Sequence, residues 1–163
     1  MGNGLGFRCN SCGHVFIACF GIGFCFPMEY EETAEEIRKG KYGQEWKELF
    51  ESIPGAAIDA EREMYVCSSC GNSKNELNLA IYRPKEPGVS KVHNESFSVA
   101  VPVYGREYVM RYELEQDYKL VKSYVHRCPE CGKRMHKYRE GDILKCPECK
   151  KGRMKPNDVL MWD

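Results

Sequence analysis

The chain lacks most of the features that would assign it to a common functional class. Its 163 residues hold 24 Lys and Arg against 24 Asp and Glu, so the net charge favours neither an anionic nor a cationic partner. The apolar run Val15–Pro27 is shorter than the 18 or more residues of a membrane-spanning helix, and Gly21 and Gly23 interrupt it. The first residues show no basic segment followed by an apolar run and a cleavage site. We therefore expect a cytoplasmic protein with no membrane contact.

Motifs of common enzymes are missing as well. The patterns GxxxxGK[ST], HExxH and GxSxG do not occur. Only four histidines are present, and their spacing does not suggest a catalytic group; they are His14, His93, His126 and His136. The sequence thus indicates neither an enzyme nor a small-molecule substrate.

Cysteine, by contrast, is abundant, with ten residues. Two intervening residues in a CxxC turn let both sulfurs point to one ion, while backbone N–H groups stabilise their negative charge. Two such pairs complete a tetrahedral four-thiolate zinc site, so the chain is predicted to bind two zinc ions. The four CxxC pairs are Cys9/Cys12, Cys67/Cys70, Cys128/Cys131 and Cys146/Cys149.

The residue after each pair supports a common turn. Gly13, Gly71 and Gly132 follow the first three pairs, and glycine accepts a positive φ without a steric penalty. Lys150 occupies this place after the fourth pair. We expect this turn either to hold a strained lysine or to move its bend to Gly152.

Loop length suggests how the four pairs combine. Fourteen residues separate Cys131 from Cys146, and closing so short a loop costs little entropy. Fifty-four residues separate Cys12 from Cys67, which is acceptable because the closure cost grows only logarithmically. The predicted sites are therefore Cys9, Cys12, Cys67 and Cys70 (site 1) and Cys128, Cys131, Cys146 and Cys149 (site 2).

Residues 124–154, YVHRCPECGKRMHKYREGDILKCPECKKGRM, resemble a zinc ribbon. Residues 7–12 and 64–71 resemble a second ribbon whose β-hairpin is opened by a long insert. As a whole, the chain is similar to small uncharacterised bacterial zinc-ribbon proteins. This resemblance implies a fold and a metal but no activity, because zinc ribbons serve many unrelated tasks.

Other uses of the cysteines remain open. Disulfides are disfavoured in a reducing cytoplasm, and iron is the alternative metal for four thiolates. Cys19 and Cys25 lie in the apolar run and are expected to be buried free thiols in the core. Alternatively, they complete a site with Cys9 and Cys12, which leaves Cys67/Cys70 as a redox pair. His126 and His136 flank the third pair and are expected near the metal site or at the surface, not as ligands.

The remaining segments predict an α+β fold. Helical spacing of apolar residues favours helices over 27–39 and 43–53, and period-two alternation favours strands over 75–84 and 96–105. The expected fold class is a small metal-stabilised α+β protein with two zinc ribbons, a helical insert (27–53) in the first, and a short antiparallel sheet. The predicted domains are 1–82, the split ribbon with its insert; 83–118, a linker and β-strand segment packing on it; and 119–163, a basic C-terminal ribbon.

Charge is unevenly distributed along the chain. Residues 119–155 hold twelve Lys and Arg against four Asp and Glu, whereas residues 1–118 hold twelve against eighteen. The favoured interpretation is a structural or protein-interaction module, with a protein partner or self-association. The alternative is a nucleic-acid or ribonucleoprotein binding accessory, because a basic ribbon neutralises phosphates. Its candidate contact residues are Lys133, Arg134, Lys137, Arg139, Lys145, Lys150, Lys151 and Arg153.

Overall fold

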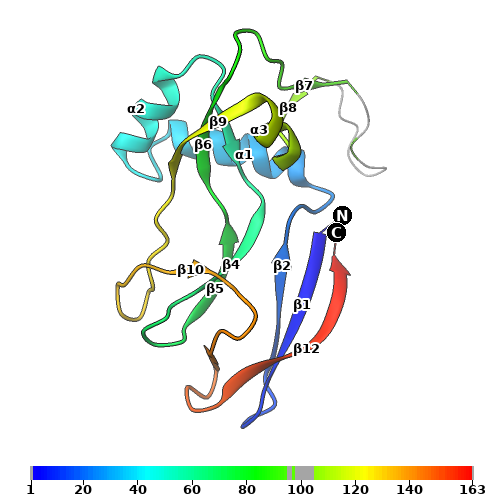
Figure 1. Ribbon diagram of the computed structural model, residues 1–163, viewed down its shortest axis with the longest axis vertical. Coiled ribbons are helices and arrows are strands. Elements are labelled where there is room, and N and C mark those ends of the chain that lie inside the picture. Colours follow the sequence, from blue (N-terminus) through cyan, green and yellow to red (C-terminus); the bar gives the residue numbers. More distant parts are fainter. Residues whose placement is uncertain (1, 95–96, 98–104, 163) are drawn as a thin grey trace. The chain divides into compact units, whose positions relative to one another are not determined.

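The computed structural model describes residues 2–94, 97 and 105–162 (Figure 1). The chain divides into two compact units, each built from separate segments. We call Met1–Gly23, Arg62–Leu77 and Val125–Asp163 the cysteine unit, because it contains all four CxxC pairs. Phe24–Glu61 and Asn78–Tyr124 form the helical unit. The predicted domains 1–82, 83–118 and 119–163 do not match this division, because both ends of the chain and a central segment fold together.

A four-stranded antiparallel sheet in the cysteine unit joins the two ends of the chain. Its strands stand in the order β11-β12-β1-β2, and they are β1 (Gly2–Cys9), β2 (Val15–Phe20), β11 (Leu144–Lys145) and β12 (Arg153–Trp162). Phe7 in β1 stacks on its β2 partner Phe16, with ring centroids 5.1 Å apart. Phe7 and Ala18 are fully buried, so one face of the sheet forms the core of this unit.

A second sheet of the cysteine unit has the order β10-β4-β5. Its strands are β4 (Arg62–Val66), β5 (Ser73–Leu77) and β10 (His136–Lys137). Met64 and Val66 pack in the same buried cluster as Phe7. The side-chain amide of Asn75 joins the two sheets: it accepts a bond from Cys19 N (2.8 Å) and donates one to Cys19 O (2.8 Å).

The helical unit places two helices and a short third one with a three-stranded sheet, β3-β6-β9. Helix α1 (Phe26–Arg38) begins with Pro27 in its first turn and buries Tyr30, Ala34 and Ile37. Helix α2 (Gln44–Ser52) buries Trp46 and Phe50. These two helices confirm the predictions over 27–39 and 43–53. The other elements are β3 (Ala57–Asp59), β6 (Ala80–Pro84), β7 (Val92–His93), β8 (Arg106–Glu107), α3 (Arg111–Asp117) and β9 (Tyr118–Ser123).

The strand predicted over 75–84 is wrong as a single element. The chain leaves the cysteine unit after Leu77, where β5 ends, and β6 begins at Ala80 in the helical unit. Between them Leu79 has a φ of +36° and is buried, and its carbonyl accepts a bond from Tyr124 N (2.9 Å). A period-two pattern reports alternating burial, but it does not report that the two halves bury in different cores.

Two further expectations are corrected by the structure, and a third lies outside the described residues. The segment predicted as linker and strand contains helix α3, whose first turn holds Glu113; the Glu113 carboxylate accepts a bond from Met110 N (2.7 Å). The strand predicted over 96–105 lies outside the described residues, except for Phe97 and Gly105. The run Val15–Pro27 is only partly core, because Val15 and Ile17 project from the outer face of β2 and are about half exposed, 50% and 49%.

Candidate metal centres

The eight CxxC cysteines gather into two clusters in the cysteine unit. Cluster A contains Cys9, Cys12, Cys146 and Cys149, and cluster B contains Cys67, Cys70, Cys128 and Cys131. In each cluster all four sulfurs lie within 4.8 Å of one another. The chain is therefore a candidate metal-binding protein with two four-cysteine sites.

The predicted partition of these cysteines is wrong. The first pair joins the fourth, not the second, and the third pair joins the second, not the fourth. Strand pairing explains the exchange: β1 pairs with β12, which places Cys9 opposite Met154, and β4 pairs with β10, which places Val66 opposite His136. Residues 124–154 consequently do not close a ribbon of their own, because their two CxxC turns serve different clusters.

The four CxxC turns share one backbone geometry. In each, the residue after the second cysteine donates its N–H to the carbonyl of the first, over 2.8 to 3.1 Å. This residue has a positive φ in every turn, between +57° and +75°. The residues concerned are Gly13, Gly71, Gly132 and Lys150. Lys150 therefore adopts the strained conformation, the first of the two outcomes expected for the fourth turn.

The sulfur spacing tests whether a metal fits. The closest sulfur pairs of cluster A are Cys9–Cys149 at 3.8 Å and Cys12–Cys146 at 3.7 Å. In cluster B, Cys67–Cys131 and Cys70–Cys128 are both 3.5 Å apart. A tetrahedron with metal–sulfur bonds of about 2.3 Å has sulfurs about 3.8 Å apart, whereas a disulfide needs about 2.05 Å. Both clusters fit a tetrahedral thiolate-bound metal such as zinc or iron, and all ten cysteines are free thiols.

Backbone N–H groups prepare selected cysteines of each cluster to bind a cation. The N–H groups of Gly152 and Lys151 lower the pKa of Cys149 to about 6. Burial raises the pKa of Cys128, but the N–H groups of Cys131 and Glu130 together outweigh it and bring the pKa to about 6. Both sulfurs are then thiolates at neutral pH, which is the form that binds metal.

Their neighbours cannot ionise beside them without a cation. The N–H of Asn72 lowers the pKa of Cys70, but burial and the sulfurs of Cys128 and Cys67 together raise it to about 12. Cys12 in cluster A shows the same rise to about 12, from burial and its neighbouring sulfurs, against the N–H of His14. A bound divalent ion would remove this repulsion, so the donor set of each cluster fits a metal.

Two glycines, Gly71 and Gly152, allow the CxxC turns to lie close together. A Cβ at Gly152 would lie 2.3 Å from Cys9 Sγ, so the fourth turn reaches the first only because this position has no side chain. A Cβ at Gly71 would lie 3.0 Å from the carbonyl of Ile143. Lys145 N donates to Gly71 O over 2.7 Å, and this bond connects the Cys67/Cys70 turn of cluster B to the residue before Cys146 of cluster A.

The histidines near cluster B do not belong to either cluster. His126 is buried and stacks on Tyr65, with ring centroids 3.7 Å apart, and its Nδ1 lies 3.2 Å from Glu76. His136 lies between Ser68 Oγ (3.1 Å) and the Asp142 carboxylate (3.0 Å). Their contacts support the turns around cluster B, as expected of residues that flank a metal site without binding it.

Cys19 and Cys25 are not buried core thiols, so this prediction is wrong. Cys19 is half-buried in β2, and Cys25 is exposed at the N-cap of α1. The alternative site that combined them with Cys9 and Cys12 is also wrong, because Cys9 and Cys12 meet the fourth CxxC pair. Cys67 and Cys70 share cluster B with the third pair, which removes the arrangement that left them as an isolated redox pair.

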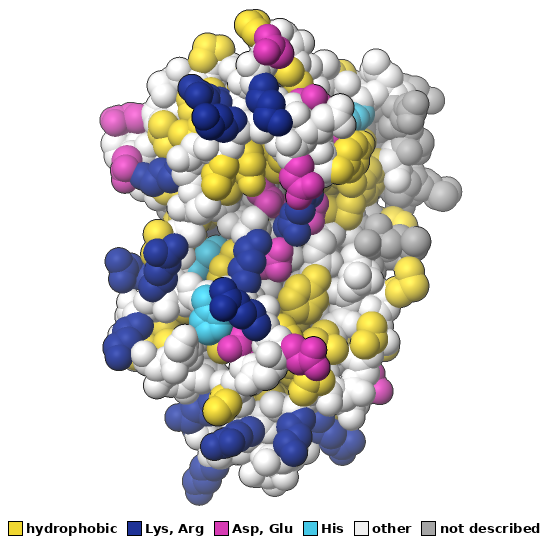
Figure 2. Space-filling model, in the orientation of Figure 1, with side chains coloured by type: hydrophobic (Ala, Val, Ile, Leu, Met, Phe, Trp, Pro, Cys, Tyr) yellow, Lys and Arg dark blue, Asp and Glu magenta, His cyan; other side chains and the backbone are white. Residues whose placement is uncertain are grey.

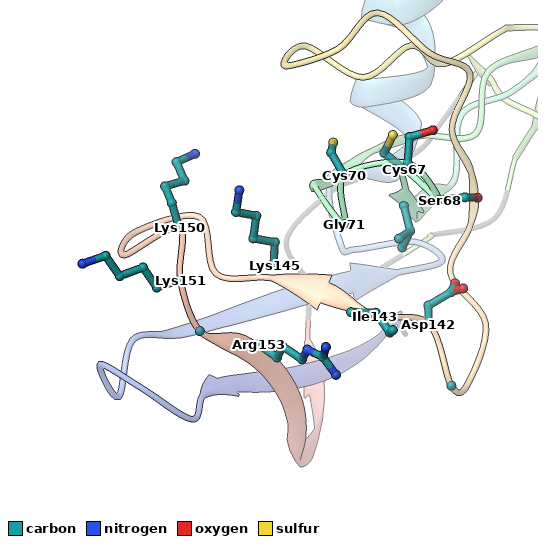
Figure 3. Close-up of a pocket in the computed structure, with 14 residues that line it drawn as sticks. Cys67, Ser68, Cys70, Gly71, Asp142, Ile143, Lys145, Lys150, Lys151 and Arg153 are labelled. Carbon is teal, nitrogen blue, oxygen red and sulfur yellow. The ribbon is translucent and has the colours of Figure 1, made fainter.

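The predicted nucleic-acid-binding residues separate into two groups. Four of them line one cavity of about 550 Å³ in the cysteine unit (Figure 3); they are Lys145, Lys150, Lys151 and Arg153. The other four do not line it. Lys137 pairs with Glu63 at 3.1 Å, while Lys133 and Arg134 follow the third CxxC turn and Arg139 precedes the loop at Gly141.

Charge differs between the two units. The cysteine unit contains thirteen Lys and Arg against eight Asp and Glu, whereas the helical unit contains eleven against sixteen. On the face shown in Figure 2, Lys and Arg side chains gather over the lower part, where Figure 1 shows the strands of the cysteine unit. The basic segment 119–155 recognised in the sequence thus contributes mostly to one folded unit.

No helix among the described residues has both the length and the apolar character needed to cross a membrane. Comparisons with protein-family models, with curated proteins and with solved structures found no match to this chain. The two cysteine clusters therefore carry the functional interpretation by themselves.

Proposed function

We propose that the protein is a cytoplasmic zinc protein whose two four-cysteine sites build a structural module for protein interaction. The observation that carries this proposal is the pair of sulfur tetrads, each with its closest sulfurs 3.5 to 3.8 Å apart. Zinc is the metal most often held by four cysteines in this arrangement. Iron is the alternative, since four thiolates also suit it.

A structural role follows from the ligand set. A zinc ion with four thiolate ligands keeps no open position for water or substrate, so such sites build folds and do not hydrolyse substrates. The buried clusters of the cysteine unit include ligands directly: Cys9 and Cys146 pack with Phe7 and Met154, and Cys67 packs with Tyr65. We expect no enzymatic turnover from these centres.

The first experiment is elemental analysis for zinc and iron, combined with a count of free thiols after denaturation without reductant. Two zinc ions and ten thiols per chain are expected for the proposed protein. If iron is found in place of zinc, the two sites would instead be interpreted as electron-transfer centres. Fewer than ten thiols would overturn the proposal for the cluster whose cysteines are oxidised.

A second candidate function, nucleic-acid binding, is favoured by one observation. Four of the predicted contact residues line a single cavity of the cysteine unit. A zinc-held fold and a nucleic-acid surface are compatible, because the metal would position the basic side chains without contacting the ligand. Binding that weakens steeply with salt would support this candidate.

A further inference from the structure

The cavity of Figure 3 concentrates cations that lack acidic neighbours. Among the described residues, no carboxylate lies within 4.0 Å of the side-chain nitrogens of Lys145, Lys151 or Arg153. Lys150 has one such neighbour, Glu130 at 3.4 Å, and both side chains are more than half exposed. The acidic lining residue Asp142 is already engaged by His136 and by Arg139 N (2.8 Å). Three of the four cations that line this cavity therefore have no carboxylate partner among the described residues.

Cross-strand pairing places like charges directly opposite one another at this surface. Lys145 in β11 pairs with Arg153 in β12, and Arg8 in β1 pairs with Lys155 in β12. Side chains alternate along a strand, so Arg153 and Lys155 share one face of β12, while Met154 between them is buried. Like charges in direct opposition destabilise a sheet, and an anion bound between them would relieve this repulsion.

Shielding of the thiolate clusters explains only part of this arrangement. Lys145 and Lys150 also line a smaller cavity of about 190 Å³ together with Glu130 and with Cys70, Cys131 and Cys146. Lys151 and Arg153 line the larger cavity and not this one. Lys151 and Arg153 share the larger cavity with Cys67 and Cys70 of cluster B, whereas neither Arg8 nor Lys155 lines either of these two cavities.

We propose that this cationic surface, formed by Arg8, Lys145, Lys151, Arg153 and Lys155, binds the phosphodiester backbone of a nucleic acid. It spans three strands and a CxxC turn, which is wider than one phosphate group, so the ligand is a polymer. Figure 3 shows the side chains of Lys145 and Arg153 pointing in different directions, so they would contact different phosphates of one backbone. The Arg153 guanidinium offers the forked donors that suit phosphate oxygens. Ser69, which lines the same cavity, adds a hydroxyl donor.

The lining also predicts the type of recognition. None of the described residues that line the cavity is aromatic, so bases have no ring on which to stack. Backbone contacts position a nucleic acid but carry little sequence information. We therefore expect binding that depends on salt and not on sequence. The inference rests on the proposed metal sites, because turns of both clusters frame the cavity.

The test is fluorescence anisotropy of the zinc-loaded full chain with a labelled single-stranded oligonucleotide of about 16 nucleotides. The double variant Lys145→Gln/Arg153→Gln should weaken binding by about tenfold and flatten the salt dependence by about 1.4 in log–log slope, the value for two lost phosphate contacts. The matched control Lys133→Gln/Arg134→Gln removes the same charge from the same unit, outside the cavity, and should bind like the wild type.

Zinc content, measured on each variant, separates this inference from the proposed function. A second variant, Arg8→Gln/Lys155→Gln, tests the surface without altering the strand that enters cluster A at Cys146. Equal loss of affinity in the control and the test variants would overturn the assignment of the surface. Equal binding of poly-glutamate would also overturn it, in favour of an acidic protein. If the chain holds two zinc ions but does not bind the oligonucleotide at low salt, the inference is overturned and the proposed metal sites are not affected.

Discussion

The two units of this protein reach stability by different means. The helical unit buries large apolar side chains from two helices and a sheet, among them Phe26, Ile37, Ile58 and Ile81. The cysteine unit has two buried clusters, and these include four of the cysteines, Cys9, Cys67, Cys128 and Cys146. Where apolar side chains are too few to form a large core, metal ligation can supply the missing free energy.

Removal of metal should have the largest effect on the difference in stability between the two units. Structural zinc contributes about 10 to 16 kcal/mol in small zinc domains, so chelation under reducing conditions should unfold the cysteine unit. The helical unit should keep its helices, because its buried side chains do not depend on the clusters. Far-UV circular dichroism should retain the helical signal, while the NMR resonances of the strands in the cysteine unit should lose their chemical-shift dispersion. Simultaneous loss of both signals would show that the units are one cooperative structure.

Paired cysteine variants should distinguish the observed clusters from the partition that loop length favours. Cys9→Ser/Cys149→Ser removes two ligands from cluster A, so one zinc ion should remain. Cys9→Ser/Cys67→Ser removes one ligand from each cluster, and zinc content should fall towards zero. If the loop-length partition were correct, these two stoichiometries would be exchanged. Mass spectrometry under native conditions measures both.

Acidification should release metal from the cysteine unit before it affects the helical unit. The folded state lowers the pKa of Cys128 and Cys149 from 9.0 to about 6. The stability that these thiolates contribute is complete above pH 9.0 and is lost as the pH falls through about 6. A zinc-sensitive dye should report release around and below this pH. Release that begins well above pH 7 would contradict the assigned hydrogen bonds to the sulfurs.

Alanine at Gly71 should disturb the contact between the clusters. Gly71 and Gly13 have almost the same φ, +72° and +75°, so alanine strains both turns by about 1 kcal/mol. At Gly71 the new Cβ would also lie 3.0 Å from Ile143 O, whereas at Gly13 the nearest atom is Arg8 Nη2 at 3.9 Å. Gly71→Ala should therefore lower the thermal midpoint more than Gly13→Ala. Equal midpoints would show that the close approach does not matter.

Glycine at Lys150 should have the smallest effect and the opposite sign. Lys150 holds a φ of +57°, which costs an ordinary residue about 1 kcal/mol and costs glycine almost nothing. Lys150→Gly should raise the stability of the cysteine unit by about 0.5 to 1 kcal/mol, because its exposed pair with Glu130 contributes little. Urea denaturation followed by zinc release measures the change. A lower midpoint would mean that the Lys150 side chain supports cluster A.

Much of the local structure was predictable from the sequence. The CxxC turns and their glycines follow from the needs of two sulfurs at one ion, and the helices follow from apolar spacing that places Tyr30, Ala34 and Ile37 on one face. The eight cysteines of the candidate sites were all identified. The role of Gly152 was not predictable, because its reason is the sulfur of Cys9, more than 140 residues away in the chain.

The cysteine chemistry of the candidate sites follows from the sequence alone, because two-residue spacing and a positive-φ position are local properties. Tertiary structure decided which cysteines meet. A loop roughly ten times longer costs only about 2 kcal/mol more to close. Burying one large apolar side chain, such as Phe7 or Met154 between the paired strands, returns about 1.5 to 3 kcal/mol. Strand pairing between the two ends of the chain therefore outweighed the short loop, and the same pairing brought the cations of the cavity together.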